Sequence, residues 1–124
     1  MNSPGLKTKR DFPSSTRKTI LLIEDDPECL DVLRALLRRK GHSVFSAKDV
    51  SSAEELWAMA RDRIDVVVSD NCLGHDRGAE LIERFQKQKP GVAFVLCSGL
   101  PYTPEVPGIR FLQKPFNIEM LLES

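Results

Sequence analysis

The chain is 124 residues long and carries 18 basic and 18 acidic side chains, so its formal net charge is zero. This length suits one domain with one hydrophobic core. The charge balance argues against a broad nucleic-acid or membrane surface. The three cysteines form no CxxC pair and no metal-ligand spacing, and the chain has no signal peptide and no long apolar run. These features predict a protein of the reducing cytosol.

The N-terminal stretch differs in composition from the rest of the chain. It combines proline, glycine and serine with a group of basic residues, namely Lys7, Lys9, Arg10, Arg17 and Lys18. We interpret residues 1–17 as a disordered basic tail, with a docking or nucleic-acid arm as the alternative. Residues 18–124 are then expected to form the folded domain.

From residue 19 onward, apolar runs alternate with amphipathic stretches. Thr19–Ile23 predicts a buried strand. A helix should follow it, because Asp26 can serve as N-cap and Pro27 suits the first helical position. Gly41 can end this helix, and Ser43–Ala47 predicts a second, less apolar strand.

The next helix is expected to begin at a capping box formed by Ser51 with Glu54, or by Ser52 with Glu55. Ile64–Ser69 predicts the third strand. The side chains that this helix would bury are Ala53, Leu56, Trp57 and Ala60.

The C-terminal half continues the alternation. Gly78–Lys89 predicts a helix, and Val92–Cys97 and Ile109–Leu112 predict the fourth and fifth strands. A last helix is expected near Asn117, which can act as its N-cap. Only ten residues, Gly99–Gly108, separate Ser98 from Ile109, and they include three prolines. We therefore expect a loop or a single turn there, in place of a full helix.

Alternating strands and helices predict parallel strands with helices on both faces of the sheet. The first, third and fourth strands are the most continuously apolar, so they should be central and the second and fifth should be edges. The predicted fold is an α/β, flavodoxin-like, doubly wound parallel five-stranded sheet. Its order is 2-1-3-4-5, with a shortened or missing fourth helix.

Polar side chains with complementary chemistry follow four of these strands. Glu24 and Asp25 follow the first, Asp70 the third, Ser98 the fourth and Lys114 the fifth. The carboxyl ends of parallel strands meet at one edge of the sheet. An ionised carboxylate can attack phosphorus without a general base, which makes Asp70 the candidate nucleophile. The other carboxylates could hold Mg²⁺, while Lys114 and Ser98 could contact the phosphoryl group.

These residues resemble the receiver domain of two-component response regulators. The resemblance runs from about Thr19 to the end of the chain. Besides the groups above, it includes Gly78, eight residues beyond Asp70, and Lys-Pro-Phe at 114–116.

The resemblance implies a role for each matching position. Asp70 would be the phosphorylation site and Lys114 the phosphate-binding cation, with a cis bond before Pro115. Ser98 and Phe111 would form the switch. The implied magnesium ligands are Glu24 through a water, Asp25 and Asp70 directly, and Cys72 through its backbone carbonyl.

The expected function is a phosphoacceptor in a two-component system or phosphorelay. Such a domain is a signalling module, not an enzyme, and it promotes its own Mg²⁺-dependent phosphorylation and slow dephosphorylation. Cys72 and Leu100, at the positions that tune water attack in the family, are poor water-orienting groups. The expected partner is a histidine kinase or a histidine phosphotransfer protein, docking near the first helix. A homodimer is possible, and no nucleic acid or membrane is expected to bind this domain.

Two other functions stay open at this point. One is a receiver-like protein-interaction module that works without phosphorylation, which the altered 99–108 region motivates. The other is an aspartyl-phosphate phosphatase of the haloacid-dehalogenase type. That class expects a DxD motif, and Asp70-Asn71-Cys72 lacks the second aspartate.

Overall fold

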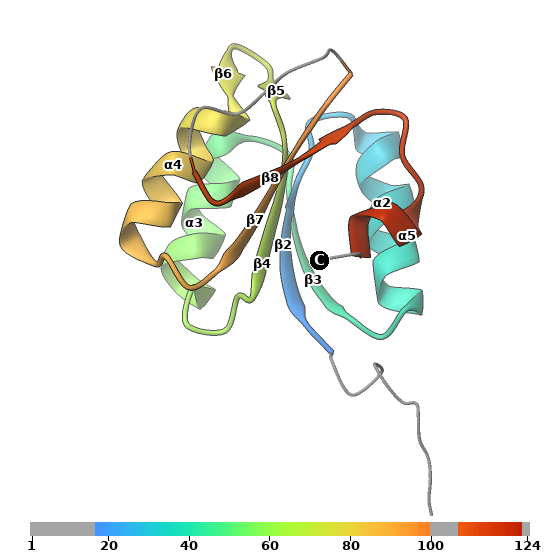
Figure 1. Cartoon of the computed structure of the whole chain (residues 1–124), viewed down its shortest axis with the longest axis horizontal. Helices are drawn as coiled ribbons and strands as arrows, with labels where there is room; N and C mark the ends of the chain where they lie inside the picture. The colour runs from blue at the N-terminus through green and yellow to red at the C-terminus, as the bar shows by residue number, and fades with distance from the viewer. Residues whose placement is uncertain (1–16, 100–106, 123–124) are drawn as a thin grey trace, which may run out of the picture.

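The computed structural model describes residues 17–99 and 107–122, and the elements are labelled in Figure 1. A sheet of five parallel strands has the order β3-β2-β4-β7-β8. This is the predicted 2-1-3-4-5 arrangement, with the two less apolar strands at the edges. The strands are β2 (Thr19–Ile23), β3 (Ser43–Ala47), β4 (Val66–Asp70), β7 (Ala93–Ser98) and β8 (Ile109–Gln113).

Four helices lie among the described residues, and they cover both faces of the sheet (Figure 1). On one face lie α3 (Val50–Ala60) and α4 (Gly78–Gln88), and on the other lie α2 (Pro27–Arg39) and α5 (Ile118–Leu122). The short link between β7 and β8 is consistent with the predicted shortened helix. Its residues 100–106 lie outside the described part of the chain, as do residues 1–16 of the predicted tail.

The core consists of two apolar layers, one on each side of the sheet. Leu21 and Ile23 point into the layer under α3 and α4, whereas Ile20 and Leu22 point into the layer under α2 and α5. Successive residues of a strand face opposite sides of a sheet. A central parallel strand must therefore be apolar at every position, which is why β2 is a continuous apolar run.

The helix starts are set mainly by local capping side chains. The Asp26 carboxylate accepts a hydrogen bond from the backbone two residues on, and Asn117 accepts one from the backbone three residues on, as predicted. The prediction for α3 is wrong. Its N-cap is Asp49, whose carboxylate accepts from the Ser52 backbone N–H at 2.8 Å, so α3 begins at Val50. Asp49 precedes both predicted serine caps in the chain, and its carboxylate already accepts the hydrogen bond of the first turn.

A short antiparallel hairpin follows β4 and is absent from the sequence-based prediction. It pairs β5 (Cys72–Leu73) with β6 (Asp76–Arg77). Gly74, in the turn, has a φ of 65°, a left-handed conformation that favours glycine. The hairpin lies at the carboxyl edge of the large sheet, beside the ends of the central strands (Figure 1).

Candidate acidic site

Three carboxylates converge at the carboxyl edge of the sheet. Glu24 and Asp25 directly follow β2, and Asp70 ends the neighbouring strand β4. One oxygen from each of these side chains lies within 4.8 Å of the others. Glu24 is 3% exposed and Asp70 is 9% exposed, whereas Asp25 faces solvent. The predicted convergence of these residues is therefore present in the fold.

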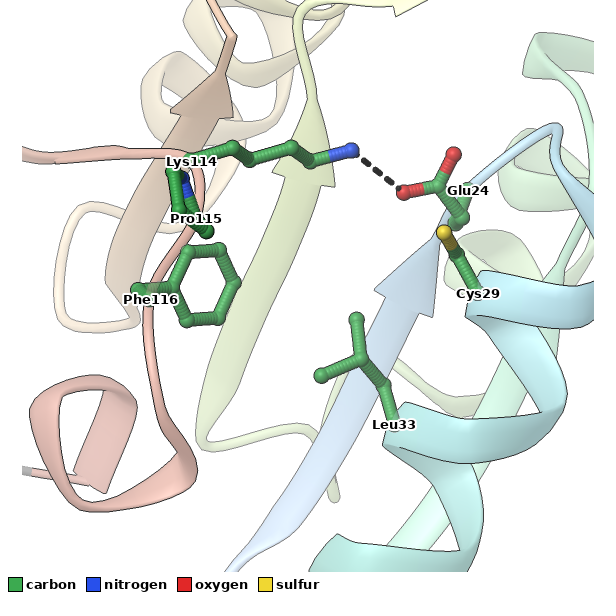
Figure 2. Close-up of a pocket in the computed structure, with 6 residues that line it drawn as sticks. All are labelled: Glu24, Cys29, Leu33, Lys114, Pro115 and Phe116. Atoms are coloured by element: carbon green, nitrogen blue, oxygen red, sulfur yellow. Dashed lines mark hydrogen bonds and ion pairs between the residues drawn. The ribbon is translucent and has the colours of Figure 1, made fainter.

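Lys114 joins the cluster from beyond the end of β8. Its Nζ lies 3.0 Å from Glu24 Oε1 and 3.1 Å from Asp70 Oδ1, so one ammonium group bridges two carboxylates. Figure 2 shows its side chain extended toward Glu24. Burial lowers the pKa of Lys114, but the hydrogen bonds to Glu24 and Asp70 outweigh it and raise the pKa above its usual value. The site thus contains a permanent cation.

The cluster carries more negative than positive charge. Burial raises the pKa of Glu24 above its ordinary value, although hydrogen bonds from Lys114 and the Asp26 backbone N–H oppose this effect. Among the residues that the structure describes, Lys114 forms ion pairs with Glu24 and Asp70, two of the three carboxylates. A surplus of clustered carboxylate oxygens is a suitable donor set for a hard divalent cation such as Mg²⁺. The residues present therefore fit the expected metal.

Backbone amides of the hairpin hold two of these carboxylates. The Cys72 N–H donates to Asp70 Oδ2 at 3.2 Å, and the Gly74 N–H donates to Asp25 Oδ2 at 3.2 Å. The hairpin therefore links the ends of β2 and β4 through their side chains. It also places the Cys72 backbone beside Asp70.

Gly78 is required by the packing of α4 against the acidic site. A Cβ atom on Gly78 would lie 2.1 Å from the Asp70 carbonyl oxygen and 2.7 Å from Ser69 Oγ. Both distances are far below normal contact, so α4 can approach the Asp70 peptide only because residue 78 lacks a side chain. The motif glycine thus has a direct steric role.

Ser98 and Phe111 lie on the strands next to the cluster. Ser98 ends β7 and is 5% exposed, and its carbonyl accepts a 2.7 Å hydrogen bond from the Lys114 N–H. Phe111 is half-buried on β8, opposite Leu96 of β7. The Lys114–Pro115 peptide bond is cis, as predicted.

A pocket of about 450 Å³ adjoins the cluster, between α2 and the segment that follows β8 (Figure 2). It shares Glu24 and Lys114 with the acidic site, and its other walls are largely apolar. The Cys29 thiol donates to Asp26 Oδ2 at 3.2 Å, which together with burial raises the pKa of Cys29, so this part of the wall is uncharged. The remaining lining residues are Leu33, Pro115 and Phe116.

Comparison with known proteins agrees with this geometry. A family model described as the response regulator receiver domain matches residues 20–124. The chain belongs to this family. Receiver domains are signalling domains of two-component systems, where they receive phosphoryl groups from histidine kinases and generally bind Mg²⁺ at an acidic pocket. The phosphatase alternative is therefore not retained.

This receiver domain is also similar to parts of two named regulatory proteins. It is 30% identical over 111 residues to the transcriptional regulatory protein GlrR of Escherichia coli, covering 85% of this chain and 24% of that protein. It is 29% identical over 107 residues to the probable transcriptional regulatory protein TcrX of Mycobacterium tuberculosis, covering 82% of this chain and 45% of that protein. The chain thus spans less than half the length of these relatives.

A solved receiver domain from Clostridium thermocellum shares the fold, with a TM-score of 0.78 at 23% identity, covering 84% of this chain and 87% of that one. Within residues 17–99 and 107–122, no helix is long and apolar enough to cross a membrane.

Sequence reasoning missed one residue at this site. Asn71, between Asp70 and Cys72, accepts a hydrogen bond from the first turn of α4 through its side chain. No local signal points to Asn71, because it lies outside the N-cap position of α4 and its hydrogen bond from Ala79 spans eight residues.

Proposed function

We propose that this receiver domain is a phosphoacceptor in which Asp70 takes a phosphoryl group from a phosphohistidine. The donor would be a histidine kinase or a histidine phosphotransfer protein in the cytoplasm. A carboxylate oxygen of Asp70 attacks phosphorus, and the phosphorus–nitrogen bond breaks with its electron pair left on the imidazole. The observation that carries this proposal is the convergence of three carboxylates with a lysine that bridges two of them.

Different residues of the chain would bind the metal ion and the phosphoryl group. Asp25, Asp70 and the Cys72 carbonyl would hold Mg²⁺, with Glu24 acting through a water. The ion, when bound, supplies positive charge that offsets the repulsion between the carboxylate and the phosphoryl group. Lys114 is already a cation beside Asp70, so it can bind a phosphoryl oxygen with little rearrangement.

Ser98 and Phe111 would form the switch that reports phosphorylation. The Ser98 hydroxyl would donate to a phosphoryl oxygen at the edge of the sheet, and Phe111 would change its packing as β8 adjusts. The signal would leave through a partner-binding surface or through another domain.

The pocket beside the cluster supports a docking position for the phosphodonor. Its apolar wall includes Leu33 of α2 and Phe116, and it opens next to the charged groups of Glu24 and Lys114. A donor helix with an apolar face could pack there, which would place its phosphohistidine near Asp70.

Intact-mass measurement after incubation with Mg²⁺ and acetyl phosphate tests the proposal. The wild-type chain should gain the mass of one phosphoryl group, and chelation of Mg²⁺ should prevent the gain. The matched control is Asp70→Asn, which should abolish labelling and leave the circular dichroism spectrum unchanged. An unlabelled wild-type protein would instead favour the phosphorylation-independent interaction module.

A further inference from the structure

Asn71 is tied to two elements by three hydrogen bonds. Its N–H donates to the Cys97 carbonyl of β7 at 2.8 Å, and its own carbonyl accepts from the Gly78 N–H at 2.9 Å. Its side-chain Oδ1 accepts from the Ala79 N–H at 3.2 Å. One residue therefore connects the end of β7 with the first turn of α4.

The bond from Ala79 replaces a cap that α4 lacks. The residue at the N-cap position of α4 is Arg77, and it makes no side-chain cap hydrogen bond. The first N–H groups of a helix have no partner within the helix, so they need an acceptor from elsewhere. In α2 and α3 that acceptor is the aspartate at the N-cap itself. In α4 it comes from Asn71, on the far side of the hairpin.

The position of Asn71 makes this cap part of the acidic site. Asn71 and Gly78 form the base of the hairpin, whose first pair is Cys72 opposite Arg77. The two peptide neighbours of Asn71 are Asp70 and Cys72, which carry two of the ligand groups in the proposed function. A shift of the first turn of α4 relative to β4 would therefore move both groups.

We propose that Asn71 is a positioning residue that sets the metal affinity of the acidic site by fixing the start of α4 against the loop carrying Asp70 and Cys72. This inference rests on the proposed Mg²⁺ site. Because coupling between two equilibria is reciprocal, metal binding must in turn stabilise the first turn of α4.

Calorimetric titration of the full chain with Mg²⁺ tests the first half of this inference. Asn71→Ala should bind Mg²⁺ about fivefold more weakly than the wild type, within the usual range of such couplings. Ser52→Ala is the matched control. It is also a neutral truncation. It removes the Ser52 hydroxyl, which accepts from the Asp49 N–H in the α3 capping box, and it should leave Mg²⁺ affinity unchanged.

Amide hydrogen exchange tests the second half. Addition of Mg²⁺ to the wild type should slow exchange at Gly78 and Ala79, and Asn71→Ala should abolish this response. Asn71→Asp keeps an acceptor oxygen, so it should restore protection of the Ala79 amide without metal. A purely structural role for Asn71 would not produce the Mg²⁺-dependent protection.

The outcomes separate this inference from the proposed function. Wild-type Mg²⁺ binding with an unchanged affinity in Asn71→Ala overturns the role of Asn71 and leaves the phosphoacceptor proposal standing. An equal loss in Ser52→Ala also overturns it, because the effect would then follow general stability. A wild-type chain that binds no Mg²⁺ overturns both proposals.

Discussion

Replacing Gly78 with alanine perturbs the contact between α4 and the acceptor peptide. The added Cβ would lie 2.1 Å from the Asp70 carbonyl oxygen and 2.7 Å from Ser69 Oγ. Neither neighbour is the flexible end of a long side chain, so the helix itself must retreat. The retreat needed to bring the Cβ to an ordinary contact distance of 3.4 Å from this oxygen is about 1.3 Å, which a closely packed interior resists.

The expected loss of stability follows from two opposing effects. Insertion of a methyl group into a well-packed site costs about 1–3 kcal/mol. Alanine recovers at most about 1 kcal/mol through its higher helix propensity, less at a helix end. The net loss should be about 1–2 kcal/mol, which corresponds to a fall in Tm of about 4–8 °C for a domain of this size. Labelling of Asp70 by acetyl phosphate should also slow, because its peptide must move.

Thermal unfolding followed by Trp57 fluorescence measures this loss, since Trp57 is 2% exposed and stacks on Phe85 at 4.3 Å between ring centroids. The matched control is Gly91→Ala, because a Cβ at residue 91 would meet nothing within 4 Å. If Gly78→Ala has the Tm and the labelling rate of Gly91→Ala, the proposed packing of α4 on the acceptor peptide is refuted.

Three further predictions concern charge, pH and the lifetime of the phosphorylated state. Lys114→Met should tighten Mg²⁺ binding in calorimetry, because a competing cation is removed. The same substitution should slow labelling by acetyl phosphate. Slower labelling in Lys114→Arg than in Lys114→Met would contradict this prediction. Burial, with nearby Lys18 and Arg17, lowers the pKa of His42. The unfolded chain therefore binds more protons, and the free energy of unfolding should fall as pH drops through about 6.5. In urea titrations His42→Asn should weaken this slope. Cys72 and Leu100 predict a phosphorylated state that persists beyond minutes in intact-mass time courses, and decay within seconds would show that water is well oriented at Asp70.

Most of the fold could be predicted because its signals are local. The apolar runs from Ile20 to Ile23 and from Val66 to Val68 report burial on both faces, and that places β2 and β4 at the centre of the sheet. The caps Asp26 and Asn117 act within three residues of themselves, so the adjoining sequence was sufficient. The predicted cap of α3 was wrong because several polar residues near Asp49 can accept from the same backbone N–H groups.

The hairpin and the Asn71 cap could not be predicted in the same way. Each hairpin strand has two residues, too few for a periodic pattern. The bond from Ala79 to Asn71 spans eight residues and exists only because the hairpin closes between them.

The amino-acid sequence by itself determined which chemical groups stand near the end of each strand, because hydrophobic patterning places each strand end to within one residue. Only the tertiary structure decided how those groups pair. Sheet order brings β2 and β4 side by side, and the path after β8 lets the Lys114 ammonium reach both Glu24 and Asp70. Such contacts depend on distances between segments far apart in the chain, which local propensity does not encode.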